Sequence, residues 1–153
     1  MPLEGKKAPA FALPSQTGDK IRLSSFKGAP VVLYFYPKDN TPGCTVEARE
    51  FRDAFRHFRK AGAEIIGISP DSVESHCKFI EKQGLNFTLL ADTEHVAADR
   101  YGVWVEKNMY GRKFWGIRRA TFLIDAAGRI DTVWPKVKPK GHAQEVLAAV
   151  KTL

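Results

Sequence analysis

The feature that most constrains this chain is an uninterrupted apolar run at residues 31–36, followed directly by a proline and a helix start. The run contains only Val, Leu, Tyr and Phe, a pattern typical of a strand buried on both faces. Pro37 has no N–H for a sheet ladder, so we expect the strand to end there. Thr41 is a favoured N-cap residue and Pro42 suits the first helical position, so a helix is predicted from Pro42 to about Lys60.

Cys44 occupies the third position of that predicted helix, within its first turn. Backbone N–H groups there have no partner inside the helix and carry partial positive charge, so they stabilise a thiolate. Gly43 has no side chain and lets another molecule approach the sulfur closely. One apolar stripe at helical spacing contains Cys44, Ala48, Phe51, Phe55 and Phe58. We therefore expect the sulfur to face the core at the floor of a pocket; the alternative is a small Cys that only packs.

The rest of the chain alternates strand and helix patterns. This predicts an α/β fold with a mixed central sheet, helices on both faces and an N-terminal β-hairpin at residues 11–23. Further strands are expected at residues 63–69, 87–91, 103–105, 119–125 and 129–134, and further helices at residues 71–83, 92–101 and 141–151. Asp71 with Glu74 resembles a capping box for the second helix. No repeat or linker is present, so residues 1–153 are predicted to form a single domain.

Composition narrows the classes of function. The net charge is +7, but Lys and Arg are interleaved with Asp and Glu, which favours a solvated basic surface over nucleic-acid binding. No stretch is apolar enough to span a membrane, and the first residues lack an apolar signal core, which predicts a cytoplasmic protein. Two cysteines in such a chain favour a transient, catalytic disulfide. The histidines show no metal-ligand spacing with the cysteines, so no metal or organic cofactor is expected.

The motif Pro37-x-x-x-Thr41-x-x-Cys44 matches the P-x-x-x-T-x-x-C pattern of peroxiredoxins. The wider segment, residues 34–48, resembles the peroxiredoxin Q branch, also called bacterioferritin comigratory protein, and the similarity continues along nearly the whole chain. The resemblance implies a thioredoxin-like fold with peroxiredoxin additions. In thioredoxins a C-x-x-C motif opens the matching helix. Thr41 stands in place of the first of those cysteines here, which argues against a general disulfide oxidoreductase.

The resemblance also implies roles for the residues of this motif. Cys44 is the expected peroxidatic Cys, whose thiolate attacks a peroxide O–O bond and becomes a sulfenic acid. The Thr41 hydroxyl could hydrogen-bond the sulfur or a peroxide oxygen, and Pro37 would shield the thiolate from water. The alternatives are structural, with Thr41 only an N-cap and Pro37 only the end of a strand.

Residues 116–125 resemble the family segment G-I-x-R-x-T-F-L-I-D, in which the Arg contacts the catalytic sulfur. The match falls on Arg119. Strand alternation agrees, because Arg119 and Thr121 share one face while Arg118 points the other way. A guanidinium stays charged and offers several donors. Glu47 matches the family pattern C-T-x-E-A and could orient Arg119; the alternative is a Glu on the helix surface.

The chain departs from many peroxiredoxin Q proteins at position 49, where Arg49 replaces a resolving Cys. Cys77, on the second predicted helix, is the other thiol, and some family members use a resolving Cys in that helix. A disulfide needs Cα atoms within about 7 Å, so this role requires the turn around Cys44 and part of the second helix to unfold locally. Cys77 also shares a helix face with Val73 and Ile80, which equally suits a Cys that packs in the core.

These observations predict a thiol peroxidase that reduces hydrogen peroxide and organic hydroperoxides. Cys77 would resolve the Cys44 sulfenic acid as an intramolecular disulfide, and thioredoxin or a similar dithiol protein would recycle it. The family resemblance suggests a monomer. Two alternatives stay open: a one-Cys peroxidase that uses an external thiol, and a peroxide sensor or redox-dependent binding module that uses Cys44 oxidation as a signal.

Overall fold

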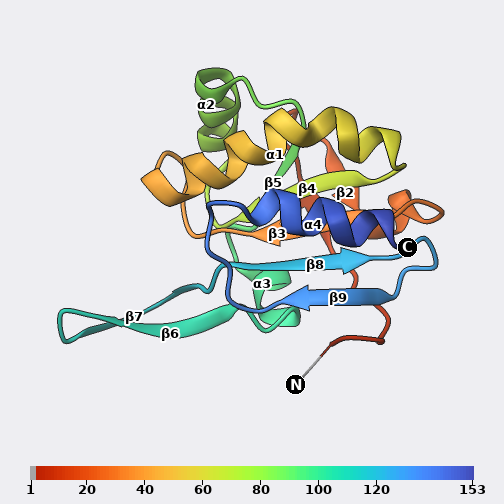
Figure 1. Cartoon of the computed structure of the whole chain (residues 1–153). Helices are drawn as coiled ribbons and strands as arrows, with labels where there is room; N and C mark the ends of the chain where they lie inside the picture. Colours follow the sequence, from red (N-terminus) through yellow and green to blue (C-terminus); the bar gives the residue numbers. More distant parts are fainter. Residues whose placement is uncertain (1–2) are drawn as a thin grey trace.

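A computed structural model describes residues 3–153; residues 1 and 2 of the predicted single domain lie outside the described residues. Its centre is a five-stranded mixed sheet in the order β5-β4-β3-β8-β9 (Figure 1). Strands β3, β4 and β5 are parallel, whereas β8 and β9 are antiparallel to their neighbours. The bounds are β3 Val31–Phe35, β4 Glu64–Ser69, β5 Thr88–Ala91, β8 Ala120–Ile124 and β9 Ile130–Trp134. The predicted mixed sheet is confirmed.

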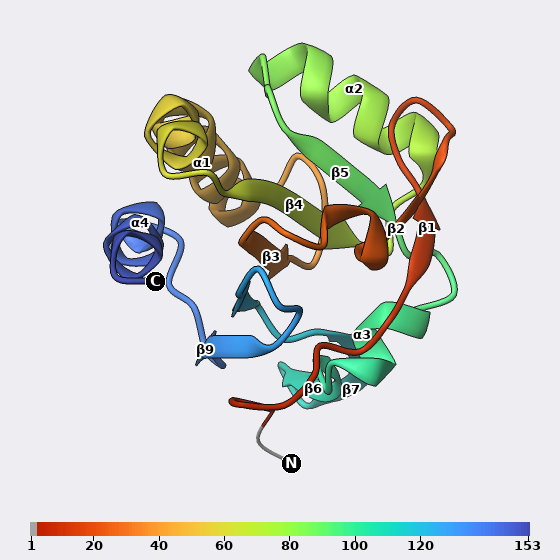
Figure 2. The same cartoon turned by 90° about the vertical axis from the view of Figure 1, so that its right-hand side faces the viewer.

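Helices cover both faces of this sheet (Figure 2). One apolar cluster joins α1 Pro42–Lys60 and α4 His142–Lys151 to one face of the sheet, and Phe79 of α2 Val73–Gln83 belongs to it. The other cluster contains α3 Val96–Arg100 and the N-terminal segment. The sequence of β3 lacks polar residues because both faces of the strand are buried. Val32 and Tyr34 belong to the first cluster, and Val31, Leu33 and Phe35 belong to the second.

The predicted N-terminal hairpin is also confirmed. Strand β1 Ala12–Pro14 pairs antiparallel with β2 Lys20–Arg22, and a 3-10 turn at Leu23–Phe26 leads toward β3. The turn of the hairpin reaches the far edge of the central sheet, where Ser15 bridges Leu90 of β5. The N-terminal segment therefore packs beside β5, close to the connection with α2.

A second hairpin, β6 Trp104–Met109 with β7 Arg112–Ile117, projects from the body of the molecule (Figure 1). The sequence predicted only residues 103–105 as extended. Tyr110 and Gly111 both have positive φ, as a tight two-residue hairpin turn requires. The hairpin lacks the alternation of a half-buried strand because most of its residues are exposed on both faces. Its exposed apolar side chains are Met109, Tyr110, Phe114 and Trp115.

Two predicted helix starts are wrong. Asp92 does not begin a helix; its carboxylate accepts hydrogen bonds from the N–H groups of Ala97 and Ala98, so α3 is shorter than predicted. Asp71 does not cap α2, because Ser72 is the N-cap and accepts from the N–H of Ser75 at 3.1 Å. Asp92 therefore caps α3 from outside the helix, whereas Asp71 accepts a hydrogen bond from the N–H of Asp39, which is distant in the sequence.

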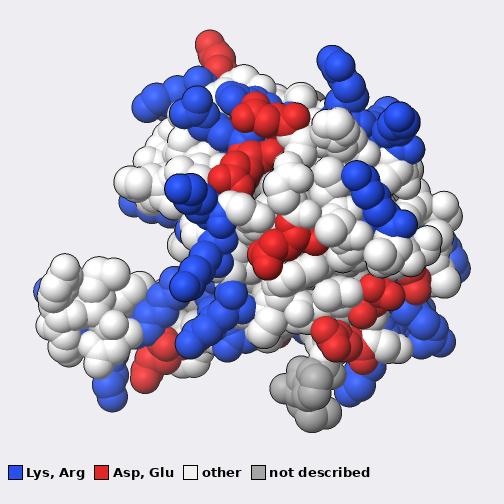
Figure 3. Space-filling model, in the orientation of Figure 1, with Lys and Arg blue, Asp and Glu red and all other residues white. Residues whose placement is uncertain are grey.

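The surface agrees with a scattered distribution of charge. On the face shown in Figure 3, Lys and Arg side chains are spread over the molecule with acidic side chains between them. Among residues 3–153, no helix combines the length and the apolar composition that crossing a bilayer requires.

Candidate active site

Cys44 lies in the first turn of α1, directly after the loop that follows β3. Pro42 is the first helical residue and Thr41 the N-cap, as the sequence predicts. The side chain is 1% exposed and belongs to the apolar cluster on this face, with Ala48 and Phe51 of the same helix. The sulfur therefore faces the core side of α1, beside the unpartnered N–H groups of the first turn.

Arg119 brings a positive charge to this sulfur. Its Nη2 lies 3.2 Å from the Sγ of Cys44, and its Nη1 donates to Oε1 of Glu47 at 2.6 Å. The residue directly precedes β8, and β8 pairs with β3, so the central sheet holds Arg119 opposite the start of α1. The three residues that the sequence assigned to one site, Cys44, Glu47 and Arg119, are in contact here.

Gly43 makes this approach possible. A Cβ atom at this position would lie 3.3 Å from Nη2 of Arg119 and 3.4 Å from Cγ of Pro139. The contact with Pro139 would be an ordinary one, but the contact with Arg119 would be tight, so a side chain here would displace the guanidinium slightly. The sequence predicted that Gly43 gives access to another molecule; in the structure it gives space to the protein's own Arg119.

The pKa values of Glu47 and Arg119 are both raised above their ordinary values. Burial raises the pKa of Glu47 to about 7, against the opposing effect of the Arg119 guanidinium. Its Oε2 is buried without a hydrogen-bond partner. Burial alone would lower the pKa of Arg119, but the charges of Glu47 and Cys44 raise it above its ordinary value. The guanidinium is therefore a permanent cation beside the sulfur.

Thr41 and Pro37 complete the loop, but neither contacts the sulfur through a hydrogen bond. The Oγ1 of Thr41 donates to the carbonyl of Lys38 at 2.9 Å and makes no capping bond to the helix. Its proton is therefore used inside the loop, while its oxygen can still accept a hydrogen bond. Pro37 is half-buried and follows Tyr36, where β3 has ended. The predicted hydroxyl–sulfur bond is absent from this conformation.

Cys77 lies on α2 and is exposed, so its interpretation as a core Cys is wrong. Val73 and Ile80 on the same helix are only half-buried. The Sγ of Cys77 donates to the carbonyl of Gln16 at 2.9 Å, whereas the Sγ of Cys44 faces Arg119. Both cysteines are free thiols, and each has its own partners.

Lys107 of β6 is a neighbour that the sequence did not indicate. Burial lowers its pKa, the charge of Arg119 lowers it further, and the charge of Cys44 opposes this change. The charges of Arg119 and Cys44 therefore act on this ammonium group in opposite directions. No local signal could have revealed it, because the strand that carries Lys107 was not predicted beyond residue 105.

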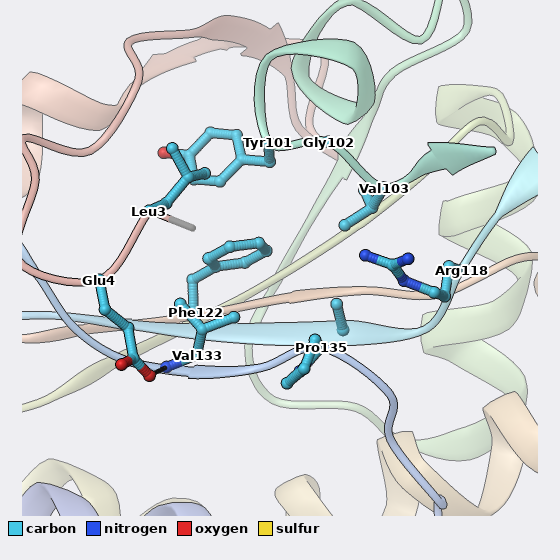
Figure 4. A pocket seen from close by; sticks show the side chains of 10 residues that line it. Leu3, Glu4, Tyr101, Gly102, Val103, Arg118, Phe122, Val133 and Pro135 are labelled. Carbon is cyan, nitrogen blue, oxygen red and sulfur yellow. Dashed lines mark hydrogen bonds between the residues drawn. The ribbon is translucent and has the colours of Figure 1, made fainter. Parts of the chain in front are cut away.

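Arg118 points away from this site, as strand alternation predicted. It lines a cavity of about 270 Å³ on the other face of the sheet, with Tyr101, Val103, Phe122 and Val133 among its walls (Figure 4). The lining of this cavity includes none of the residues around Cys44. Adjacent arginines thus serve two different environments.

One cluster of potential metal ligands lies near this region. Asp39, Asp71 and His76 each offer one ligand atom, all within 4.8 Å of one another. However, the two nitrogens of His76 face Oδ2 of Asp39 at 2.8 Å and the carbonyl of Leu90 at 2.9 Å. These groups satisfy each other through hydrogen bonds, so the cluster is a protein network rather than an open coordination site.

Comparisons with known proteins show the family of this chain. Residues 4–133 match the model of the AhpC/TSA family. Peroxiredoxin Bcp of Bacillus subtilis is 50% identical over 149 residues, which are 97% of this chain and 95% of that protein. Peroxiredoxin Bcp of Escherichia coli is 46% identical over 147 residues, 96% of this chain and 94% of that protein.

Solved structures give the same result. Bacterioferritin comigratory protein of Xanthomonas campestris, described for its alkyl peroxide reduction activity, superposes with a TM-score of 0.89 at 44% identity, covering 93% of this chain and 90% of that one. Peroxidoxin BcpB from Mycobacterium tuberculosis is 35% identical, with a TM-score of 0.88 and coverage of 100% and 99%. The predicted thioredoxin-like peroxiredoxin fold is confirmed. This chain therefore belongs to the AhpC/TSA family, as a peroxiredoxin similar to the Bcp, or peroxiredoxin Q, proteins.

Proposed function

We propose that this chain is a thiol peroxidase that reduces hydrogen peroxide and organic hydroperoxides through Cys44. The observation that carries the proposal is the buried Sγ of Cys44, in the first turn of α1, at 3.2 Å from Nη2 of Arg119. The thiolate attacks one peroxide oxygen, the O–O bond breaks, and the other oxygen leaves with a proton as water or an alcohol. Cys44 becomes a sulfenic acid. The alkyl peroxide reduction of the Xanthomonas campestris protein supports organic substrates.

Arg119 would stabilise the charge that moves onto the leaving oxygen. Its Nη2 already lies beside the sulfur, and its Nη1 is fixed by Glu47, so the guanidinium is oriented before peroxide arrives. The Thr41 hydroxyl would accept a hydrogen bond from the peroxide, because it already donates its proton to the backbone carbonyl of Lys38. Pro37 would limit access of water to the thiolate. Lys107 adds a second positive charge near the site and would favour the same anionic leaving group.

Cys77 would resolve the sulfenic acid. Its thiol is exposed, and position 49, where related chains carry a resolving Cys, holds an exposed Arg. The Cys77 sulfur attacks the Cys44 sulfur, an S–S bond forms, the S–O bond breaks, and the hydroxyl leaves as water. Because the two thiols have separate partners, part of the chain must move before this bond forms. In the one-Cys alternative an external thiol performs the same attack.

Recycling requires a dithiol protein. We propose thioredoxin or a protein like it, acting on a monomeric, single-domain enzyme in a reducing compartment such as the cytoplasm. The disulfide would expose a sulfur on α2 to the incoming thiolate, since Cys77 is already at the surface. Support for one domain comes from the single five-stranded sheet, with apolar clusters on its two faces.

Steady-state turnover tests the proposal. With thioredoxin, thioredoxin reductase and NADPH, we expect continuous NADPH consumption on addition of hydrogen peroxide or cumene hydroperoxide, and none with Cys44→Ser. Oxidation of a single equivalent followed by arrest would instead favour a peroxide sensor. Efficient reduction of insulin disulfides would favour a general disulfide oxidoreductase.

A further inference from the structure

A buried polar network joins the loop before α1 to helix α2. Oδ2 of Asp39 lies 2.8 Å from Nδ1 of His76 and accepts a hydrogen bond from Oγ of Ser75 at 2.7 Å. Oδ1 of Asp39 accepts from the hydroxyl of Tyr36 at 2.6 Å. Asp39 is 5% exposed and His76 is 0% exposed. We call the pair Asp39–His76 the clasp.

The protons of the clasp can be assigned from its acceptors. Nε2 of His76 faces the carbonyl of Leu90 at 2.9 Å, and a carbonyl only accepts, so Nε2 carries a proton. Burial alone would raise the pKa of Asp39, but His76, Tyr36 and Ser75 together lower it below its ordinary value. The clasp is therefore a buried hydrogen bond between the Asp39 carboxylate and the His76 imidazole, 2.8 Å long. Such a buried pair is stable only while both partners stay in place.

The clasp fastens the two segments that carry the cysteines. Asp39 lies in the loop between β3 and α1, five residues before Cys44, and His76 is the residue before Cys77 on α2. The loop is attached to the start of α2 once more, because the N–H of Asp39 donates to Oδ2 of Asp71 at 2.8 Å. Elsewhere on α2 the buried side chain is Phe79, and the carbonyl of Gln83 at the end of the helix accepts a hydrogen bond from Nη1 of Arg52 at 2.6 Å.

We propose that the clasp is a positioning device for the resolving step, which rests on the proposed role of Cys77. While the clasp is closed, the loop and α2 hold Cys44 beside Arg119 and Cys77 beside Gln16. Opening the clasp releases both segments, so that the two sulfurs can meet. The strength of the clasp therefore sets how long the Cys44 sulfenic acid survives before resolution.

This lifetime has a chemical consequence. If Cys77 reaches the sulfenic acid, a disulfide forms and water leaves. If a second peroxide molecule arrives first, its O–O bond breaks, one oxygen adds to the Cys44 sulfur, and water and an unreactive sulfinic acid result. A weaker clasp should therefore favour the disulfide over the sulfinic acid. The first attack on peroxide, which uses Cys44 and Arg119, should change little.

Asp39→Asn is the decisive variant, because it removes the charge and keeps the shape and one acceptor oxygen. Reduced protein is mixed with one equivalent of hydrogen peroxide, quenched with acid and an alkylating reagent at successive times, and weighed intact. We expect disulfide formation at least about threefold faster than in the wild type. At excess peroxide we expect a smaller sulfinic acid fraction. Ser75→Ala, which removes one hydrogen bond from α2 to Asp39 and keeps the contact between Asp39 and His76, should act in the same direction by less.

The matched control is Asp92→Asn. Asp92 is also buried and accepts two backbone hydrogen bonds, but it caps α3 and belongs to neither cysteine segment. It should leave the rate of disulfide formation unchanged. If Asp39→Asn and Ser75→Ala form the disulfide at the same rate as the wild type, the proposed role of the clasp is wrong. The proposed role of Cys77 would be unaffected by that result. Equal acceleration by Asp92→Asn would also overturn the clasp. No intramolecular disulfide in the wild type would overturn both proposals.

Discussion

Cys44 and Cys77 are the same residue type in opposite surroundings. Cys44 is buried in a helix of 19 residues that is anchored along its length by Ala48, Phe51, Ala54 and Phe58. Cys77 is exposed on a helix of 11 residues with two buried side chains. The first arrangement fixes a nucleophile against a cation, and the second allows a thiol to travel. We infer that attack on peroxide depends on the rigidity of α1 around Cys44. Resolution of the sulfenic acid depends instead on the mobility of α2 around Cys77.

The largest effect should separate the two cysteines completely. Cys44→Ser should reduce the rate of peroxide consumption by at least about a thousandfold. A serine hydroxyl stays protonated at neutral pH and is a much weaker nucleophile than a thiolate. Cys77→Ser should keep the first attack near the wild-type rate and stop at the sulfenic or sulfinic acid. Stopped-flow measurement of one peroxide equivalent tests both. Equal loss of the first attack in the two variants would remove the distinction.

Substitution of the two adjacent arginines tests whether contact with Cys44 determines the rate of peroxide attack. Arg119→Ala should slow peroxide attack by about 10²- to 10³-fold, since it removes a preorganised cation from the reacting sulfur. Arg118→Ala is the matched control, because its guanidinium lines the cavity on the other face of the sheet (Figure 4). It should leave the rate within about twofold of the wild type. Similar losses in the two variants would show that general basicity, rather than contact with Cys44, matters.

Gly43→Ala should separate activity from stability. The new Cβ would meet Arg119 and Pro139, so peroxide attack should slow by roughly three- to tenfold as the guanidinium shifts. Ala is a better helix residue than Gly, so the free energy of unfolding should not fall and can rise by about 0.5–1 kcal/mol. Second-order rate constants and urea unfolding measure the two quantities. Full activity in a folded variant would contradict the proposed contact.

Ionisation of Glu47 should give the smallest effect, a change of stability with pH. The pKa of Glu47 is about 7 in the folded protein and its ordinary value is 4.5, so the folded state binds the proton more tightly. The stability from this proton is complete below pH 4.5 and is lost as pH rises through 7, up to about 3 kcal/mol in total. Glu47→Gln keeps an acceptor for Arg119 and does not titrate.

Urea unfolding of both proteins between pH 5 and 8 isolates this contribution. The free energy of unfolding of the wild type, minus that of Glu47→Gln, should decrease as pH rises. A difference that stays constant would mean that Glu47 does not change protonation in this range.

Much of the fold was predictable because its signals are local. The apolar run before Pro37, the Thr41–Pro42 helix start and the turn at residues 126–128 each lie within a few residues. The hairpin β6–β7 was missed because exposed strands carry no alternation. Asp71 was assigned to the wrong role because its partner, the N–H of Asp39, lies 32 positions away in the chain.

In the candidate site, too, local features were predictable and contacts between residues far apart in the sequence were not. Cys44 could be identified from the physics of a helix start, but Arg119 was found only through a family motif, because 75 positions separate it from the sulfur that it contacts. Asp39 and His76 had no such motif, and each resembles an ordinary surface residue in the sequence. Their contact follows from the approach of α2 to the loop after β3, which only the folded chain reveals.

In the proposed reaction Cys44 attacks peroxide and Cys77 resolves the sulfenic acid that forms. The most direct test is the intact mass of the reduced protein after one equivalent of hydrogen peroxide, with no added thiol. We expect a monomer lighter by about 2 Da, which corresponds to a Cys44–Cys77 disulfide. A gain of about 16 or 32 Da would instead mean an unresolved sulfenic or sulfinic acid, and would contradict the role of Cys77. An unchanged mass would contradict the role of Cys44.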